Sequence, residues 1–505
     1  MTEASSAQHC DKKKEMINGI LLGVVFVCLA AMSFYIVMAS PLNPWSHRLP
    51  DIDSSIFIYF GRGMRAGMTP YVDMIDHKGP LLWTIEWLGL TIGRGSLTGI
   101  WALEWIMMFI DLLLLFGCAR FFTKNRGLCL AAVMITLLPI VYLYQGGNFS
   151  EEWSLPFILL SFYLYLDYLA NEKLNLFRIT VCGICMGAVL CIRANMISVW
   201  VVMTLAALVR MIKEKDWKLI RNSVVGFLSG ICLIVLPYIA YYASKGALYD
   251  MQMWAITNNV NYVEAGTSSV FSLETIRFFL KIDMLLSIPV VIMVIILLVR
   301  KRFNWIWGVV LFYIVSMILC TMGGRTFPHY AMVLLPCLIV PVSVILCEIV
   351  RAGRKYWGIL LLAVLLIVGK MSAFSAIQTH NSNIELTFHA DPNNDSVVEY
   401  ILQNSEQGEP ILVMALNAYY YDAADRFANT KYFIQHYMYD DDYSLYATIM
   451  DGIEEDPPRL VIMRRYNVDG DPWGEWMTRF YEEMCTKTDV YTLYETDFFV
   501  AFKRK

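Results

Sequence analysis

Side chains able to activate a hydroxyl group and to bind a phosphate are concentrated in the segment 40–79. Its carboxylates and cations include Asp51, Asp53, Asp73, Asp76, His77 and Lys78. An ionised carboxylate can act as a general base toward a hydroxyl group. Lysine, arginine and histidine can form charge-assisted hydrogen bonds to a phosphate. Taken alone, however, Asp53 stands just before a predicted helix, and this position favours a helix N-cap over a catalytic carboxylate.

Three later turns contain further polar residues of this kind. They provide Glu151 and Glu152, then Arg193, and finally Arg325, His329 and Tyr330. Each turn also has a structural interpretation. Acidic residues at a helix start interact favourably with the helix dipole, and long cationic or aromatic side chains reach toward a membrane interface. The spacing alone leaves both interpretations open at each turn.

The composition indicates which elements must position these side chains. Of the 505 residues, 57% are hydrophobic and only 17% are charged, whereas an average soluble protein has about 25% charged residues. The 12 cysteines are too sparse for a disulfide-stapled secreted chain. A soluble globular protein and a disordered chain are therefore excluded, and a polytopic α-helical membrane protein is predicted.

Eleven runs are apolar enough to cross a bilayer, which needs about 17–25 residues. They cover 16–38, 99–120, 127–144, 152–170, 178–194, 195–212, 221–242, 282–300, 303–321, 328–350 and 355–376. The apolar segment Pro80–Gly93 is shorter and is expected to be interfacial or re-entrant rather than spanning. With eleven crossings, Lys12–Lys14 and the basic connectors all face the cytoplasm, as the positive-inside rule requires.

The net charge of -4 conceals a change in composition near Phe374–Thr379. Residues 1–376 are apolar and basic, and they are predicted to form the catalytic membrane body, with outer loops at 40–79 and 243–281. Residues 377–505 are acidic and alternate strand and helix patterns, which is typical of a small α/β domain. The predicted topology places the N-terminus in the cytoplasm of a multi-pass cell-membrane protein and this domain outside the cytoplasm.

The polar candidates collect on one side of this predicted topology. Ser54–Ala66 has apolar residues at helical spacing, which predicts an amphipathic helix on the outer membrane surface. The turns at Arg193 and at 323–330 fall on the same side. Charges near a membrane that do not follow the topology rules usually mark a site. Acids beside phosphate-binding cations suit a lipid-phosphate-linked donor whose head group faces outward.

With these features the sequence resembles the GT-C type of membrane glycosyltransferase, in the branch of protein O-mannosyltransferases and lipid A aminoarabinose transferases. The first-loop resemblance lies in Asp53, Phe57, Met64, Gly67, Thr69-Pro-Tyr71, Asp73 and Asp76-His-Lys78-Gly-Pro80-Leu-Leu-Trp83. Gly146–Trp153 and Gly324–Tyr330 resemble two later motifs of the family. This chain departs from the branch at Ser54, where a second acid is typical, and at Gly79, where Lys-Pro-Pro is typical.

The resemblance implies a role for each candidate. Asp53, with Asp51 as the alternative, would deprotonate or orient the acceptor hydroxyl. The donor phosphate would be held by Lys78, Arg193, Arg325 and His329. The sugar and the acceptor would be bound by Asp73, Asp76, His77, Glu151, Glu152 and Tyr330. Enzymes of this family usually invert the configuration of the transferred sugar.

The expected partners are a polyprenyl-phosphate-linked sugar, a glycan, lipid or protein acceptor of the cell envelope, and the bilayer, with no nucleic acid. No clean metal-ligand cluster stands out, so the use of a divalent metal ion stays open. One alternative is a polyprenyl-lipid transporter or flippase, but the chain has no internal repeat and its charges lie at one face. A polysaccharide polymerase or ligase, the other alternative, would keep its large functional loop late in the chain.

Overall fold

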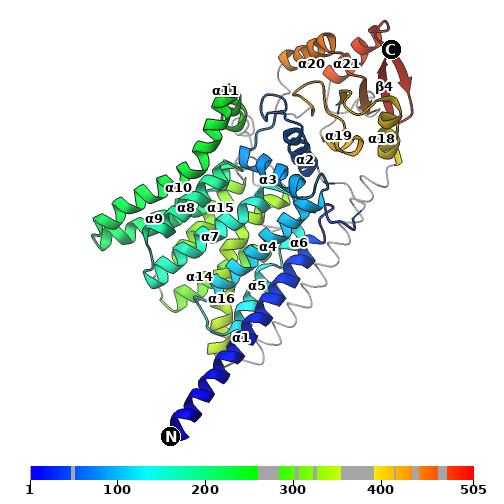
Figure 1. Cartoon of the computed structure of the whole chain (residues 1–505). Helices are drawn as coiled ribbons and strands as arrows, with labels where there is room; N and C mark the ends of the chain where they lie inside the picture. Colours follow the sequence, from blue (N-terminus) through cyan, green and yellow to red (C-terminus); the bar gives the residue numbers. More distant parts are fainter. Residues whose placement is uncertain are drawn as a thin grey trace.

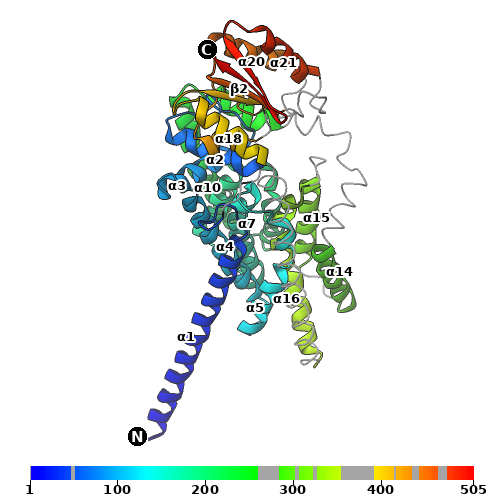
Figure 2. The same ribbon diagram turned by 90° about the vertical axis from the view of Figure 1, so that its right-hand side faces the viewer.

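The computed structural model describes nine stretches of the chain and single residue 50. The stretches are 2–46, 52–259, 284–301, 306–321, 327–353, 392–414, 417–434, 443–464 and 475–505. A body of roughly parallel helices forms one end, and a sheet covered by helices forms the other (Figure 1). The N-terminus of α1 (Thr2–Val37) projects from the end of the body that lies farthest from the sheet, in both views (Figure 2).

Six helical segments of the described residues are long and apolar enough to cross a membrane. They are Asn18–Val37 within α1, α4 (Thr98–Ala119), α7 (Ser150–Asn171), Ala194–Lys213 with α9 (Ser198–Lys213), α10 (Trp217–Ser244) and Pro328–Arg351 with α16 (Leu335–Arg351). Shorter apolar helices are α5 (Arg126–Thr136), α8 (Leu176–Leu190), Leu286–Val299 within α14 (Met284–Val299) and α15 (Trp307–Thr321). A many-helix membrane body is therefore confirmed. The total of eleven crossings stays a prediction, because its last run, 355–376, lies outside the described residues.

Two of the predicted apolar segments are each divided into separate helices. The run 127–144 is divided into α5 and the short α6 (Ile140–Leu143) at Pro139, which has no N–H to continue the hydrogen-bond ladder. The segment 178–212 was expected to turn near Arg193, and α8 indeed ends at Leu190 before η1 (Ala194–Met196) leads into α9.

Two helices connect the body to the sheet end. The predicted amphipathic helix exists as α2 (Ile52–Arg65), but it does not lie exposed on a surface, since nearly all residues from Ser54 to Gly61 are buried. The short apolar segment forms α3 (Pro80–Ile92), which packs against α2 and α4. A Cβ atom on Gly61 would lie only 2.9 Å from the backbone carbon of Glu86, so the α2–α3 contact requires a residue without a side chain.

The C-terminal unit, residues 392–505 as far as they are described, contains a four-stranded sheet. Its strands are β1 (Ile411–Met414), β2 (Leu460–Arg464), β3 (Tyr491–Glu495) and β4 (Phe499–Arg504), in the order β1-β2-β4-β3. Its helices are α18 (Pro392–Asn404), α19 (Tyr419–Ala424), α20 (Tyr443–Glu455) and α21 (Glu475–Thr486). Strands β1 and β2 are parallel, with Val413 opposite Ile462, and the other pairs are antiparallel.

Strands β1, β2 and β4 are largely buried on both faces of the sheet, where alternate side chains point to opposite sides, whereas β3 is exposed from Thr492 to Glu495. Leu412 and Val461 share one hydrophobic cluster with residues of α20 and α21, whereas Ile411 and Ile462 join the cluster that includes α18, α19 and the membrane body. The hydrophobic core is therefore continuous from the helical body through α2 into the C-terminal unit.

The contact between α2 and the C-terminal unit is polar as well as apolar. The Arg62 guanidinium lies 2.7 Å from an Asp422 oxygen and 2.7 Å from an Asp425 oxygen. The Tyr59 ring stacks on Phe433 with 4.0 Å between the ring centroids. Asp53, the first candidate site residue, lies in the first turn of α2. This contact therefore also holds the helix that carries Asp53.

Candidate active site

Asp53 lies inside the first turn of α2, which begins at Ile52, and not at the position before the helix that an N-cap would occupy. Its side chain is half-buried and forms no hydrogen bond or ion pair with another described residue. Burial raises the pKa of Asp53, but the positive charges of Lys78, His329 and Arg193 more than offset this, so the pKa lies below its ordinary value of 3.8. Asp53 is therefore an ionised carboxylate in the field of several cations.

Lys78 is one of these cations and is only 5% exposed. Its Nζ lies 3.6 Å from the Asp76 carboxylate and 5.1 Å from the centre of the Phe57 ring on α2. Burial lowers the pKa of Lys78, but the carboxylates of Asp53 and Asp76 outweigh it, so the pKa is raised above its usual value. Lys78 therefore stays positively charged although it is buried.

Asp76 holds the turn that carries Lys78. Its Oδ1 accepts a hydrogen bond of 3.0 Å from the Lys78 backbone N–H and lies 3.5 Å from His77 Nδ1. On the other side of the turn, the Tyr71 hydroxyl donates to the Lys78 carbonyl at 2.6 Å and accepts from Trp83 Nε1 at 3.1 Å. Tyr71, which adopts a φ of 70°, was not among the predicted site residues. The Pro-Tyr pattern in the first loop was its only signal.

Arg193 approaches the same place from the turn between α8 and α9. Its guanidinium pairs with Glu151 at the start of α7 and lies 4.4 Å from the centre of the Tyr330 ring. Ser150 Oγ donates to Glu151 at 3.0 Å and thereby helps to hold this carboxylate. Burial lowers the pKa of Arg193, but Tyr330, Glu151 and Asp53 outweigh it and the pKa is raised. Glu151 thus contacts the cation, in a position where the resemblance had implied a substrate contact.

His329 and Tyr330 belong to η4 (Pro328–Leu334), immediately before α16. The His329 ring stacks on Phe149 with 4.1 Å between centroids, and its Nδ1 lies 3.1 Å from Gln145 Oε1. Its Nε2 is buried and has no hydrogen-bond partner within the described stretches. One nitrogen of this histidine therefore remains available for a ligand.

Not all predicted site residues meet in this cluster. Asp73 is exposed, and its Oδ2 accepts a 2.6 Å hydrogen bond from the Thr69 N–H, so it closes a surface turn. Glu152 points elsewhere and accepts from the Asn148 N–H at 2.7 Å. Asp51 and Arg325 lie outside the described residues, as does most of the predicted second outer loop beyond residue 259.

A buried polar network lies next to Asp53, and of the members named here only Glu152 was a predicted site residue. Asn148 Nδ2 donates to Ser54 Oγ at 2.8 Å, and the Asn148 N–H is shared between Glu152 and Glu104, with Glu104 Oε1 at 2.7 Å. Ser40 Oγ donates to the other oxygen of Glu104 at 3.0 Å. The available signal was Glu104 itself, a carboxylate within an apolar run, because such groups face the protein interior.

The residues were also tested for a metal site. Within the described part of the chain, no group of three or more His, Cys, Asp or Glu side chains is arranged to hold a metal ion. In the cluster around Asp53 the acids lie beside cations, with Asp76 near Lys78 and Glu151 on Arg193. The sequence left the use of a divalent metal ion open, and the described residues offer no site for one.

Comparison with solved structures confirms the predicted GT-C fold. ArnT from Cupriavidus metallidurans, a GT-C lipid A aminoarabinose transferase solved bound to undecaprenyl phosphate, is 12% identical, with 95% of this chain and 97% of that chain covered and a TM-score of 0.62. Its apo structure covers 96% and 98%, at 12% identity and a TM-score of 0.61. AglB from Archaeoglobus fulgidus, an oligosaccharyltransferase solved with an inhibitory peptide and a dolichol-phosphate, is 12% identical, covers 95% and 74%, and has a TM-score of 0.48.

Sequence comparison identifies a family but no individual curated relative. No curated protein matches this chain. A family model described as "Putative competence-induced protein Ccs4 N-terminal domain" matches residues 14–355. This range contains the helices of the membrane body and every described residue of the cluster around Asp53. Because the match covers well over half of the sequence, the chain belongs to the family of this Ccs4 N-terminal domain.

Proposed function

We propose that this protein is an integral-membrane glycosyltransferase that moves a sugar from a polyprenyl-phosphate donor to a cell-envelope acceptor at the outer membrane face. The observation that carries the proposal is the ionised Asp53 carboxylate, which lies without a direct partner in the field of Lys78, Arg193 and His329. The shared fold with ArnT, which was solved bound to undecaprenyl phosphate, supports a lipid-phosphate donor. In this proposal the N-terminus is cytoplasmic and the C-terminal unit lies on the outer side.

The cations would bind the donor phosphate. Lys78 Nζ is too far from Asp76 for a hydrogen bond, at 3.6 Å, so its three N–H groups remain free to donate to phosphate oxygens. Asp76 and Glu151 each offset one cation, and Arg325 would supply further positive charge, as the resemblance implies. When the bond between the sugar C1 and the phosphate oxygen breaks, its electron pair stays on the phosphate, and these cations stabilise the growing negative charge.

Asp53 would act on the acceptor. The acceptor hydroxyl oxygen forms the new bond to the sugar C1 from the face opposite the leaving phosphate, and its proton passes to Asp53 in an inverting displacement. A carboxylate with a low pKa is a weak base in the empty enzyme. The bound donor phosphate partly neutralises the cations that lower this pKa, so donor binding raises it and makes Asp53 a better base.

Two acidic residues would act through the cations. Asp76 fixes the backbone and the charge of Lys78, and Glu151 fixes the guanidinium of Arg193. Both are positioning residues in this proposal, and neither needs to touch the sugar. His77 and Tyr330 border the same space and remain candidates for contacts with the sugar or the acceptor.

The test is transfer from a labelled polyprenyl-phosphate sugar in membranes that contain the full chain. We expect Asp53→Asn to lower the transfer rate by about 100-fold or more, the usual contribution of a general base. The matched control is Asp451→Asn, the same change at an exposed position of α20. Transfer at the wild-type rate by a folded and inserted Asp53→Asn protein would show that the assigned mechanism is wrong. Lipid movement across the bilayer without sugar transfer would favour a flippase.

A further inference from the structure

A second cavity lies on a different face of α2 from Asp53. It is open to solvent on one side, has a volume of about 660 Å³ and is lined by residues of α2, the turn between α3 and α4, and α19 with the residues that follow it. Ile58, Arg62 and Arg65 of α2 line it, at spacings of four and three residues that place them on one side of the helix. Asp53 and Phe57 occupy a different side, toward Lys78. The cavity is therefore separate from the candidate active site.

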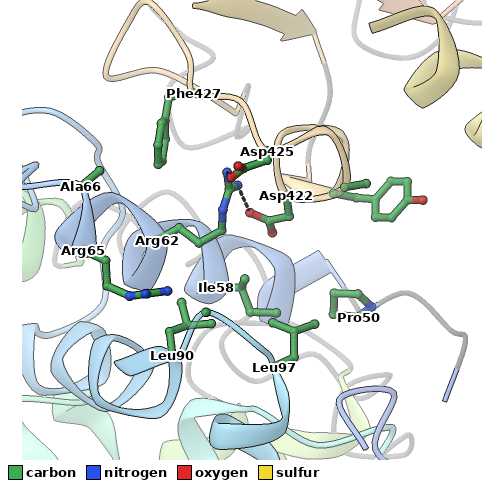
Figure 3. Close-up of a pocket in the computed structure, with 13 residues that line it drawn as sticks. Pro50, Ile58, Arg62, Arg65, Ala66, Leu90, Leu97, Asp422, Asp425 and Phe427 are labelled. Atoms are coloured by element: carbon green, nitrogen blue, oxygen red, sulfur yellow. Dashed lines mark hydrogen bonds and ion pairs between the residues drawn. The ribbon is translucent and has the colours of Figure 1, made fainter. Parts of the chain in front are cut away.

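The two arginines in this cavity have different surroundings. Arg62 points toward the C-terminal unit and is paired with both Asp422 and Asp425, so the lining holds two guanidinium groups and two carboxylates (Figure 3). The Arg65 guanidinium instead extends into the cavity above Leu90 (Figure 3). Arg65 is exposed and forms no ion pair with any residue that the structure describes. The Arg65 guanidinium can thus donate hydrogen bonds to an anionic ligand.

The backbone beside Arg65 leaves room for such a ligand. Gly95 has a φ of +98°, which residues with side chains rarely adopt, and a Cβ there would lie 3.0 Å from Arg65 Nη1. The preceding residue, Arg94, is exposed and also lacks an ion pair in the described parts of the chain. No side chain at Gly95 therefore stands between this turn and the Arg65 guanidinium.

The other half of the cavity is apolar and lies at the membrane boundary. Leu90 and Leu97 line it, and Leu97 directly precedes α4, a candidate span that begins at Thr98. On α3 next to this turn, Leu88 is 42% exposed and Ile92 is 54% exposed. Apolar side chains beside the end of a span are the surface that acyl chains cover, while arginines at that level reach the head groups.

We propose that this cavity binds the anionic phosphate head group of a membrane lipid through Arg65, with the acyl chains along the exposed face of α3. The proposal does not depend on the proposed transferase activity, because no residue of the cavity belongs to the cluster around Asp53. It adds a lipid site at the junction between the membrane body and the C-terminal unit.

The experiment is a lipid titration of the purified full chain in a neutral detergent. Bound lipid is counted by native mass spectrometry with phosphatidylglycerol, which is anionic, and with phosphatidylcholine, which has no net charge. Wild type should retain phosphatidylglycerol at concentrations where Arg65→Gln does not, with an affinity at least about tenfold higher, because a charge-assisted hydrogen bond is lost. The matched control, Lys245→Gln, removes an exposed cation far from the cavity and should bind as wild type does.

A cavity-filling variant and a competition with inorganic phosphate test the proposal further. Ala423→Trp fills the cavity from an exposed position on α19 and should also abolish the tight phosphatidylglycerol binding without touching a charge. Inorganic phosphate at millimolar concentration should not displace the lipid. Equal lipid retention by wild type, Arg65→Gln and Ala423→Trp would overturn the proposal. Displacement by phosphate alone would show that a soluble anion, and not a lipid, is the ligand.

Discussion

Two faces of the same helix, α2, use carboxylates in different ways. Toward the C-terminal unit, Asp422 and Asp425 both form an ion pair with Arg62, which also donates to the carbonyl of Tyr421 at 3.0 Å. Toward the membrane body, Asp53 has no direct partner among the described residues, and cations act on it only from a distance. Charges in direct ion pairs hold two parts of a protein together, whereas a charge without a contact partner is available to a ligand. In the proposed function the first face therefore serves structure and the second serves chemistry.

The largest expected effect comes from removing the cation closest to the chemistry. Lys78→Gln should reduce kcat/KM for sugar transfer by about 100-fold, because one preorganised positive charge at the leaving phosphate is lost. The measurement is transfer from a labelled polyprenyl-phosphate sugar at several donor concentrations. Lys245→Gln removes an exposed lysine elsewhere and should leave transfer unchanged. Equal rates in wild type and Lys78→Gln would remove Lys78 from the donor site.

The structural face should respond in stability. Arg62→Ala leaves Asp422 and Asp425 without their cation and should destabilise the attachment of the C-terminal unit by about 3 kcal/mol. Limited proteolysis and thermal unfolding in detergent measure this, with Lys245→Ala as the exposed control. A stability within about 0.5 kcal/mol of wild type would contradict the structural role of this contact.

The pH dependence of sugar transfer tests the face of α2 that carries Asp53. Asp53 must be ionised to accept a proton, and its pKa in the empty enzyme lies below 3.8, so kcat/KM for the donor should be lost only as the pH falls below that value. In Lys78→Gln the largest charge that lowers this pKa is absent, so the acid limb of kcat/KM should move to higher pH, by about one unit. An acid limb at the same pH in both proteins would mean that another group controls it.

Two neighbouring serines provide the finest comparison. Ser54 Oγ accepts from Asn148 in the membrane body, whereas Ser55 Oγ accepts from the Ala418 N–H of the C-terminal unit at 3.1 Å. Ser54→Ala should lower kcat about fivefold, because the turn that carries Asp53 loses a support. Ser55→Ala should cost about 1 kcal/mol of stability and leave kcat unchanged. The reverse pattern would contradict the division of roles between the two faces.

The sequence indicated candidate residues where a polar or charged group interrupted the pattern of its own segment. Lys78 and His329 are polar groups next to long apolar runs, and Asp53 opens an amphipathic pattern, so each stands out within its own segment. Asp73 stands out in the same way, yet it only closes a turn with Thr69. Local pattern therefore identified a pool of candidates and could not separate the members that converge from those that do not.

The sequence could not predict the partners of these residues, because the contacts join distant parts of the chain. Arg62 pairs with residues some 360 positions away, and Arg193 pairs with Glu151 across 42 positions. Glu104 and Asn148 looked like isolated polar residues and share one hydrogen bond in the buried interior. No periodicity within a window of ten or twenty residues contains that information.

The amino-acid sequence by itself determined the membrane body, the approximate positions of its helices and the turns that carry ionisable groups, because hydropathy and helix-breaking residues act locally. The tertiary structure alone decided which carboxylate forms a direct ion pair and which has no direct partner among the described residues. That distinction depends on which charges folding brings within a few ångströms of each other. For α2, it separates Asp422, held by Arg62, from Asp53, which faces Lys78 and Arg193 and remains free to act on a bound substrate.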